Sequence, residues 1–123
     1  MHILVVDDSR AMRSIVVRAV KAAGYEQASF VEAQNGAEAL AAIRASRPDL
    51  ILSDWNMPEM SGIEFIRNIR GNDKFKSIPV LMVTTNAAKD DIVEALKAGV
   101  NNYVVKPFTP DTIKEKIEAV LAK

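Results

Sequence analysis

Reactive polar side chains follow directly after four short apolar runs of the sequence. Asp7 and Asp8 follow ILVV, Asp54 follows LILS, Thr84 follows VLMV and Lys106 follows YVV. If these runs are parallel strands of one sheet, their carboxyl ends lie along one edge, where ligands bind in such sheets. Three carboxylates, a hydroxyl and an ammonium group would then converge, a set that can hold a divalent cation and receive a phosphoryl group.

Three carboxylates in one place need positive charge beside them. Two like charges about 4 Å apart repel by roughly 4 kcal/mol at an effective dielectric constant of 20. Lys106 supplies one positive charge, and a hard dication would supply two more. The chain has no cysteine and one histidine, His2, which precedes the first apolar run. Carboxylate ligands without nearby histidine or cysteine suit magnesium better than zinc, so the sequence predicts Mg²⁺.

A carboxylate at such a site can also act as a nucleophile and form an acyl phosphate. Phosphoryl transfer needs an in-line nucleophile and neutralisation of the charge on the phosphoryl oxygens. The metal, Lys106 and the hydroxyl of Thr84 can provide that neutralisation. Each of these residues alone is typical of a turn or a helix cap. Their joint occurrence after four expected strands favours a functional site.

The elements that must position these groups are visible in the hydrophobic pattern. Apolar runs of strand length alternate with amphipathic segments of helix length, which predicts five βα units and a parallel sheet. The right-handed crossover rule favours an open sheet with helices on both faces. The second strand is the least apolar and is expected at an edge. The predicted strands are Ile3–Val6, Ala28–Val31, Leu50–Ser53, Val80–Val83 and Tyr103–Val105.

Capping residues and turn residues delimit the helices between these strands. The first helix is expected from a Ser9 cap to Gly24, the second from Asn35-Gly36 to Arg47-Pro48, and the fourth from about Lys89 to Gly99. The loop 54–62 precedes a third helix, and Thr109 with Pro110 begins the last. For the first helix the 3.6-residue period predicts a buried face that consists of Met12, Ile15, Val16, Ala19, Val20 and Ala23.

The composition bounds the class of protein. The 123 residues suit one domain, and 16 basic side chains balance 16 acidic ones. Balanced charge gives no general attraction to nucleic acid or to an anionic membrane. No apolar stretch reaches the roughly 20 residues that span a bilayer, and no targeting segment is visible. We therefore expect a cytoplasmic, monomeric protein that binds neither nucleic acid nor membranes.

Four motifs together resemble the receiver domain of two-component response regulators. They are VVDDS, SDWNMPEMSG, VLMVTTNA and YVVKPFT, and they are most similar to the single-domain chemotaxis regulators of that family. The resemblance covers residues 1–123, which leaves no room for an output domain. It implies a flavodoxin-like (βα)5 α/β fold, a doubly wound five-stranded parallel sheet with the strand order 2-1-3-4-5, for which such regulators are a known example.

The resemblance also implies a role for each residue of the site. Asp54 would accept a phosphoryl group from a phosphohistidine of a sensor histidine kinase (CheA-like). Asp8, Asp54 and the backbone carbonyl of Asn56 would bind Mg²⁺ directly, with Asp7 acting through water. Lys106, positioned by a cis bond to the following proline, would contact the phosphoryl group. The protein would be a switch with slow autodephosphorylation, not an enzyme.

A relay to a binding face is implied as well. Thr84 would move to form a hydrogen bond with the phosphoryl group, and Tyr103 would turn inward behind it. This movement would reshape the face made by the fourth helix, the fifth strand and the fifth helix, where Lys89, Tyr103 and Lys116 are expected. The implied partners are the kinase, a flagellar motor switch protein or another target, and a phosphatase.

Some positions depart from the pattern of the chemotaxis group. Ser61 stands where many relatives carry aspartate, Thr85 where a small residue is usual, and Asn86 where glutamate is common. Thr85 adds bulk that would narrow access to Asp54. We expect Asn56, Thr85 and Asn86 to tune the rates of phosphorylation and hydrolysis.

Other functions remain open at this point. The domain could drain phosphoryl groups from a shared kinase, act outside chemotaxis, or be a degenerate receiver that only binds partners. A phosphatase of the haloacid dehalogenase type usually carries D-x-D after its first strand, whereas this chain has the adjacent pair Asp7-Asp8. A flavodoxin-like cofactor binder would need a glycine- or hydroxyl-rich phosphate loop, and DDSRAM offers none.

Overall fold

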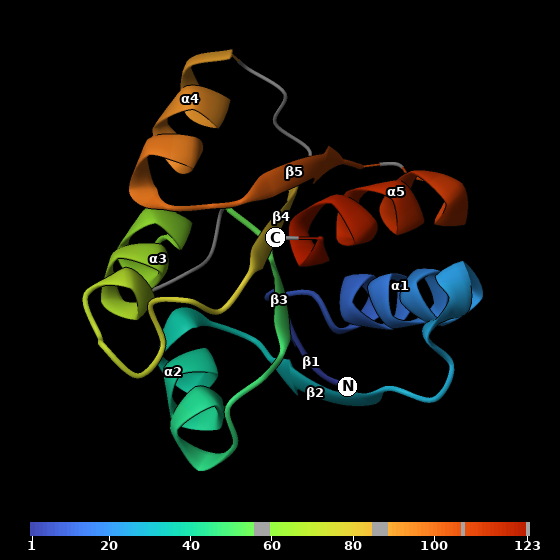
Figure 1. The fold of residues 1–123 in the computed structure, drawn as a ribbon, viewed down its shortest axis with the longest axis horizontal. Coiled ribbons are helices and arrows are strands. Elements are labelled where there is room, and N and C mark those ends of the chain that lie inside the picture. Colours follow the sequence, from blue (N-terminus) through green and yellow to red (C-terminus); the bar gives the residue numbers. More distant parts are fainter. Residues whose placement is uncertain (56–59, 85–88, 107, 123) are drawn as a thin grey trace.

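The computed structural model describes residues 1–55, 60–84, 89–106 and 108–122. Its centre is a five-stranded parallel sheet with the order β2-β1-β3-β4-β5 (Figure 1). The predicted α/β class and the flavodoxin-like order are thereby confirmed. The strands are β1 (His2–Val6), β2 (Ser29–Ala33), β3 (Leu50–Ser53), β4 (Val80–Thr84) and β5 (Asn102–Val105).

Helices cover both faces of the sheet. In Figure 1, α1 and α5 lie on one side and α2, α3 and α4 on the other. None of the described helices is both long enough and apolar enough to cross a membrane. The helices are α1 (Arg10–Val20) with a continuing π-helical turn η1 (Lys21–Tyr25), α2 (Gly36–Ala45), α3 (Gly62–Arg70), α4 (Lys89–Ala98) and α5 (Pro110–Leu121).

The core consists of two apolar layers separated by the sheet. Alternate side chains of β1 enter opposite layers: Ile3 and Val5 pack towards α1 and α5, and Leu4 and Val6 towards α2 and α3. All four residues of β3 are buried, as expected for a strand that is covered on both faces. This firm packing fixes the ends of β1 and β3, from which the acidic residues emerge.

The second strand and the first helix differ from the prediction. The second strand is Ser29–Ala33 and not Ala28–Val31, because its register against β1 begins at the pair His2 and Ser29. Its place at the edge of the sheet is confirmed. Ile15 is 48% exposed, so its assignment to the buried face was wrong. Because an α-helix turns by about 100° per residue, Ile15 lies about 90° around the helix axis from the centre of the face that α1 presents to the core.

The turns largely follow the predicted chemistry. The Ser9 side chain accepts the Met12 N–H and begins α1. Gly24 and Gly99 both have positive φ, 114° and 119°. Gly99 follows α4 directly, as expected, whereas Gly24 is a non-helical kink inside η1, one residue before that segment ends. The Thr109 side chain begins α5 in the same way as Ser9 begins α1. The Ser9 and Thr109 caps set where α1 and α5 leave the carboxyl edge of the sheet.

Candidate functional site

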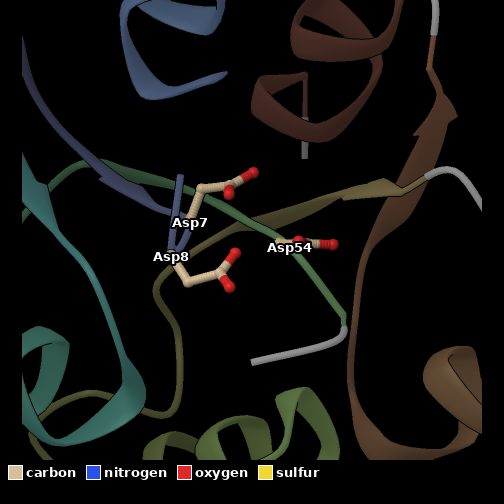
Figure 2. A group of neighbouring side chains, drawn as sticks. All are labelled: Asp7, Asp8 and Asp54. Atoms are coloured by element: carbon tan, nitrogen blue, oxygen red, sulfur yellow. The ribbon is translucent and has the colours of Figure 1, made fainter. Parts of the chain in front are cut away.

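Three aspartates gather at the carboxyl ends of β1 and β3. Carboxylate oxygens of Asp7, Asp8 and Asp54 all lie within 4.8 Å of one another, and Figure 2 shows them side by side. The register of the two strands causes this, since Val6 pairs with Ser53 and the following residues become neighbours. The Asp54 N–H donates to the Val6 carbonyl at 2.9 Å. The convergence expected from the sequence is therefore present.

Asp7 is the most deeply buried of the three aspartates. It is 3% exposed, and both of its carboxylate oxygens have partners. Oδ1 accepts the Ser9 N–H at 2.9 Å, and Oδ2 accepts a hydrogen bond from Lys106 Nζ at 2.9 Å. Asp8 is exposed to solvent and Asp54 is half-buried. The group thus combines a fixed anion with two anions that a ligand can reach.

Lys106 brings positive charge to this group from the end of β5. Its side chain is only 9% exposed, and Nζ lies 2.9 Å from Asp7 Oδ2 and 3.7 Å from Asp54 Oδ2. Within the described residues it is the cation that forms ion pairs with these carboxylates. Three ionised carboxylates against one ammonium leave an excess of two negative charges. That excess favours a divalent cation.

The predicted relay residues lie along the neighbouring strands. Thr84 is fully buried at the end of β4, and its carbonyl accepts the Lys106 N–H at 2.7 Å. Tyr103 is half-buried on β5, and Lys116 Nζ of α5 lies 5.2 Å from the centre of its ring. Tyr103 and Lys116 are thus neighbours, as expected for one face. The side chain of Lys89, predicted for the same face, lies outside the description.

Four further predictions also fall outside the described residues. They concern the carbonyl of Asn56, the tuning residues Thr85 and Asn86, and the cis bond to Pro107.

The chain on either side of residues 56–59 is closely packed. The Gly62 N–H donates to the Trp55 carbonyl at 2.9 Å, and a Cβ at position 62 would lie 2.6 Å from that oxygen. Glycine is therefore required there. The Ser61 side chain caps α3 by accepting the Glu64 N–H at 3.3 Å, a role that we did not predict from the sequence. The pattern Ser-x-x-Glu was the available signal.

Arg13 is a site residue that the sequence did not reveal. Its Nη1 donates to the backbone carbonyl of Asp7 at 2.7 Å, and its Nε donates to Glu32 Oε1 at 3.0 Å. The side chain is 13% exposed although it sits on the first turn of a surface helix. No motif marks this contact, because it joins α1 to the ends of two different strands.

Comparison with known proteins agrees with this geometry. The family of response regulator receiver domains matches residues 3–118. The chain belongs to this family. The receiver is 48% identical to chemotaxis protein CheY1 of Helicobacter pylori over 98% of this chain and 97% of that protein. It is a receiver domain of the two-component type, similar to chemotaxis regulators.

Solved structures of receivers have the same fold. Chemotaxis response regulator CheY4 of Vibrio cholerae has a TM-score of 0.87 and 38% identity, with 98% of each chain covered. The Mn²⁺-bound form of response regulator Rcp1 has a TM-score of 0.79 and 28% identity over 97% of this chain and 90% of that one.

Proposed function

We propose that this receiver is a Mg²⁺-dependent switch that accepts a phosphoryl group on Asp54. The observation that carries the proposal is the cluster of Asp7, Asp8 and Asp54 at the carboxyl edge of the sheet, with Lys106 beside it. Such a site has the anions to bind a dication, a carboxylate to act as nucleophile and an ammonium to neutralise the phosphoryl oxygens.

The donor atoms fit magnesium. Mg²⁺ prefers oxygen ligands at about 2.1 Å in octahedral geometry, so its ligands are separated by roughly 3 to 4.2 Å. The three carboxylate oxygens, within 4.8 Å of one another, are close to that arrangement. Asp8 and Asp54 are the direct ligands in our proposal, together with the Asn56 carbonyl. Both oxygens of Asp7 already accept hydrogen bonds, which supports its contact through water.

Asp54 is the acceptor in this proposal. Its carboxylate oxygen would form a bond to phosphorus while the bond from phosphorus to the imidazole nitrogen of the kinase breaks, and the electron pair stays with the imidazole. The bound metal would neutralise charge on the phosphoryl oxygens. Lys106 Nζ, now 3.7 Å from Asp54 Oδ2, is near enough to contact the new group after a small movement.

The signal would leave the site through Thr84 and Tyr103. A phosphoryl group shifts the population of states only through contacts that are better in the active state. A shift from 1:99 to 99:1 needs about 5.5 kcal/mol of such difference. The Lys106 contact does not provide it if it forms in both states. The hydroxyl of Thr84 and the half-buried ring of Tyr103 are the groups whose contacts would change.

The face that Tyr103 and Lys116 share would then bind the target. We propose a CheA-like sensor histidine kinase as phosphoryl donor and a flagellar motor switch protein as target, in the cytoplasm and with the receiver as a monomer. The support is the 48% identity to a chemotaxis protein that is nearly the same length. We expect Asn56, Thr85 and Asn86 to tune the rates of phosphorylation and of hydrolysis. The substitutions Thr85→Ala and Asn86→Glu would then change at least one of these two rates.

Trp55 provides the test of this function. Its backbone N–H donates to Asp54 Oδ1 at 2.7 Å, so a change at that carboxylate moves the residue that carries the fluorescent indole. Mg²⁺ and then acetyl phosphate should each change its fluorescence. In Asp54→Asn the response to acetyl phosphate should vanish. A response that persists in this variant would show that Asp54 is not the acceptor.

A further inference from the structure

We propose that Arg13 is a positioning residue for the Mg²⁺ site, which holds the peptide group between Asp7 and Asp8 in the orientation that turns both carboxylates towards the cation. This inference rests on the magnesium binding proposed above. It concerns a residue that touches neither the metal nor the phosphoryl group, and acts through the backbone of two residues that face them.

The contacts of Arg13 fix its guanidinium at two points. Nη1 donates to the Asp7 carbonyl at 2.7 Å, and Nε donates to Glu32 Oε1 at 3.0 Å. The side chain is 13% exposed, whereas that of Glu32 on the edge strand β2 is 45% exposed. A planar guanidinium that Glu32 holds at Nε can hold a second atom, here the carbonyl oxygen, in one direction.

That carbonyl belongs to the peptide group that joins the two aspartates. The peptide group is planar, so the direction of the Asp7 C=O sets the direction in which the chain enters Asp8. The rest of Asp7 is held as well, by the Ser9 N–H and Lys106 at the carboxylate and by the Ala33 carbonyl at its own N–H. Arg13 therefore completes the restraint on the turn that presents Asp8 to the metal.

The charge of Arg13 and its restraint on the Asp7 carbonyl have opposite effects on the affinity for the metal. A guanidinium beside a cation site repels a dication, so removal of its charge alone would strengthen metal binding. Glu32 lies 3.0 Å from the guanidinium and offsets part of that repulsion. Removal of the positional restraint would weaken binding instead. Lysine retains the charge but lacks the planar fork that makes both bonds, so Arg13→Lys isolates the restraint.

The choice of ion separates a positional role from a general loss of stability. Mg²⁺ demands nearly ideal octahedral geometry at 2.0–2.1 Å, whereas Ca²⁺ accepts flexible geometry at 2.3–2.6 Å. A loosened turn should therefore cost more Mg²⁺ affinity than Ca²⁺ affinity. A changed charge acts on both dications alike. The ratio of the two dissociation constants is thus the informative quantity.

The experiment measures Mg²⁺ and Ca²⁺ binding to the full chain by calorimetry. Arg13→Lys should weaken Mg²⁺ binding about tenfold, the lower end of the effect of residues that orient metal ligands, and Ca²⁺ binding less. The matched control is Arg10→Ala, which removes an exposed positive charge from the same turn of α1. Arg10→Ala should leave the ratio of the two constants unchanged.

Thermal unfolding without metal shows whether each variant is folded. If Arg13→Lys is not folded, Glu32→Ala provides the test instead. This substitution at an exposed position releases the Nε end of the guanidinium. It should reduce the preference for Mg²⁺ over Ca²⁺, measured as the ratio of the two dissociation constants, about threefold. A folded Arg13→Lys with the wild-type ratio would overturn the inference and leave the proposed function intact. A wild-type protein that binds no Mg²⁺ would overturn the proposed function, and this inference with it.

Discussion

Arg70 and Lys106 are both partly withdrawn from water, and their surroundings differ in kind. Arg70 at the end of α3 donates five hydrogen bonds to neutral acceptors: two to the Gly99 carbonyl and one each to the Lys76 carbonyl, the Ile78 carbonyl and Asn101 Oδ1. Burial lowers the pKa of its guanidinium. Lys106 instead faces two of three clustered carboxylates.

The difference separates a structural cluster from a binding site. At Arg70 the donors and acceptors match, and the cluster ties α3 to the end of α4 and to the starts of β4 and β5. At Lys106 the charges of the described residues do not match, since one ammonium stands against three carboxylates. Clustered like charges are costly, and a fold keeps them where a ligand supplies the missing charge.

Removal of the Arg70 side chain should have the largest effect on stability. Arg70→Met leaves the carbonyls of Gly99 and Ile78 without this donor and should lower the free energy of unfolding by about 3 kcal/mol, with Mg²⁺ affinity unchanged. The control Arg67→Met, on an exposed position of the same helix, should cost less than about 0.5 kcal/mol. Urea unfolding measures both, and equal values would refute the structural role.

Removal of one carboxylate from the acidic cluster should raise the free energy of unfolding of the metal-free protein instead of lowering it. Without Mg²⁺, Asp8→Asn should raise the free energy of unfolding by about 1 kcal/mol, because it relieves repulsion among three carboxylates within 4.8 Å. Asp73→Asn, at an exposed position beside Lys76, should change little. With Mg²⁺ the wild type should gain stability by linkage, and the variant should gain less. A loss of stability in the metal-free variant would show that the cluster is not under strain.

Removal of the ammonium should strengthen metal binding. Lys106→Met deletes the cation that competes for Asp7 and Asp54, and Mg²⁺ should bind about threefold more tightly. Lys114→Met, on the exposed face of α5, should leave the affinity unchanged. Calorimetry compares the two. Weaker binding in Lys106→Met would mean that the ammonium orders the site more than it opposes the metal.

Tyr25 should show that burial and a neighbouring charge can perturb a group that lies outside the acidic site. Burial and the nearby Glu118 raise its pKa above the ordinary 10.0. The unfolded chain therefore releases this proton first, so the contribution to stability is complete below pH 10.0 and is lost as the pH rises through the folded pKa. Between pH 10.0 and the folded pKa, wild-type stability should fall more steeply with pH than that of Tyr25→Phe. Identical slopes would show that Tyr25 is not perturbed.

The sequence was sufficient for the fold and for the convergence of the three aspartates with Lys106. Apolar runs followed by polar residues place Asp7, Asp54, Thr84 and Lys106 at strand ends, and the parallel arrangement of the strands brings these ends together. The prediction from the periodicity of the first helix was wrong for Ile15, which is exposed. The period gives the direction of the apolar face, but it does not tell which edge of that face the neighbouring elements leave uncovered.

The contacts of the long cations could not be predicted. Arg13 reaches a carbonyl of β1 and a side chain of β2, and Arg70 reaches residues about 30 positions further along the chain. These contacts depend on distances between elements that only the packed fold defines. For the same reason the closer pairing of Lys106 with Asp7 than with Asp54 became visible only in the structure.

The most direct test of the central claim maps the acyl phosphate. The full chain is incubated with acetyl phosphate, with and without Mg²⁺, and the modified carboxylate is trapped by borohydride reduction and located by peptide mass spectrometry. We expect modification at Asp54 only, and only with Mg²⁺. Modification at Asp7 or Asp8, or equal modification of Asp54 without the metal, would contradict a magnesium-dependent phosphoryl acceptor at this site.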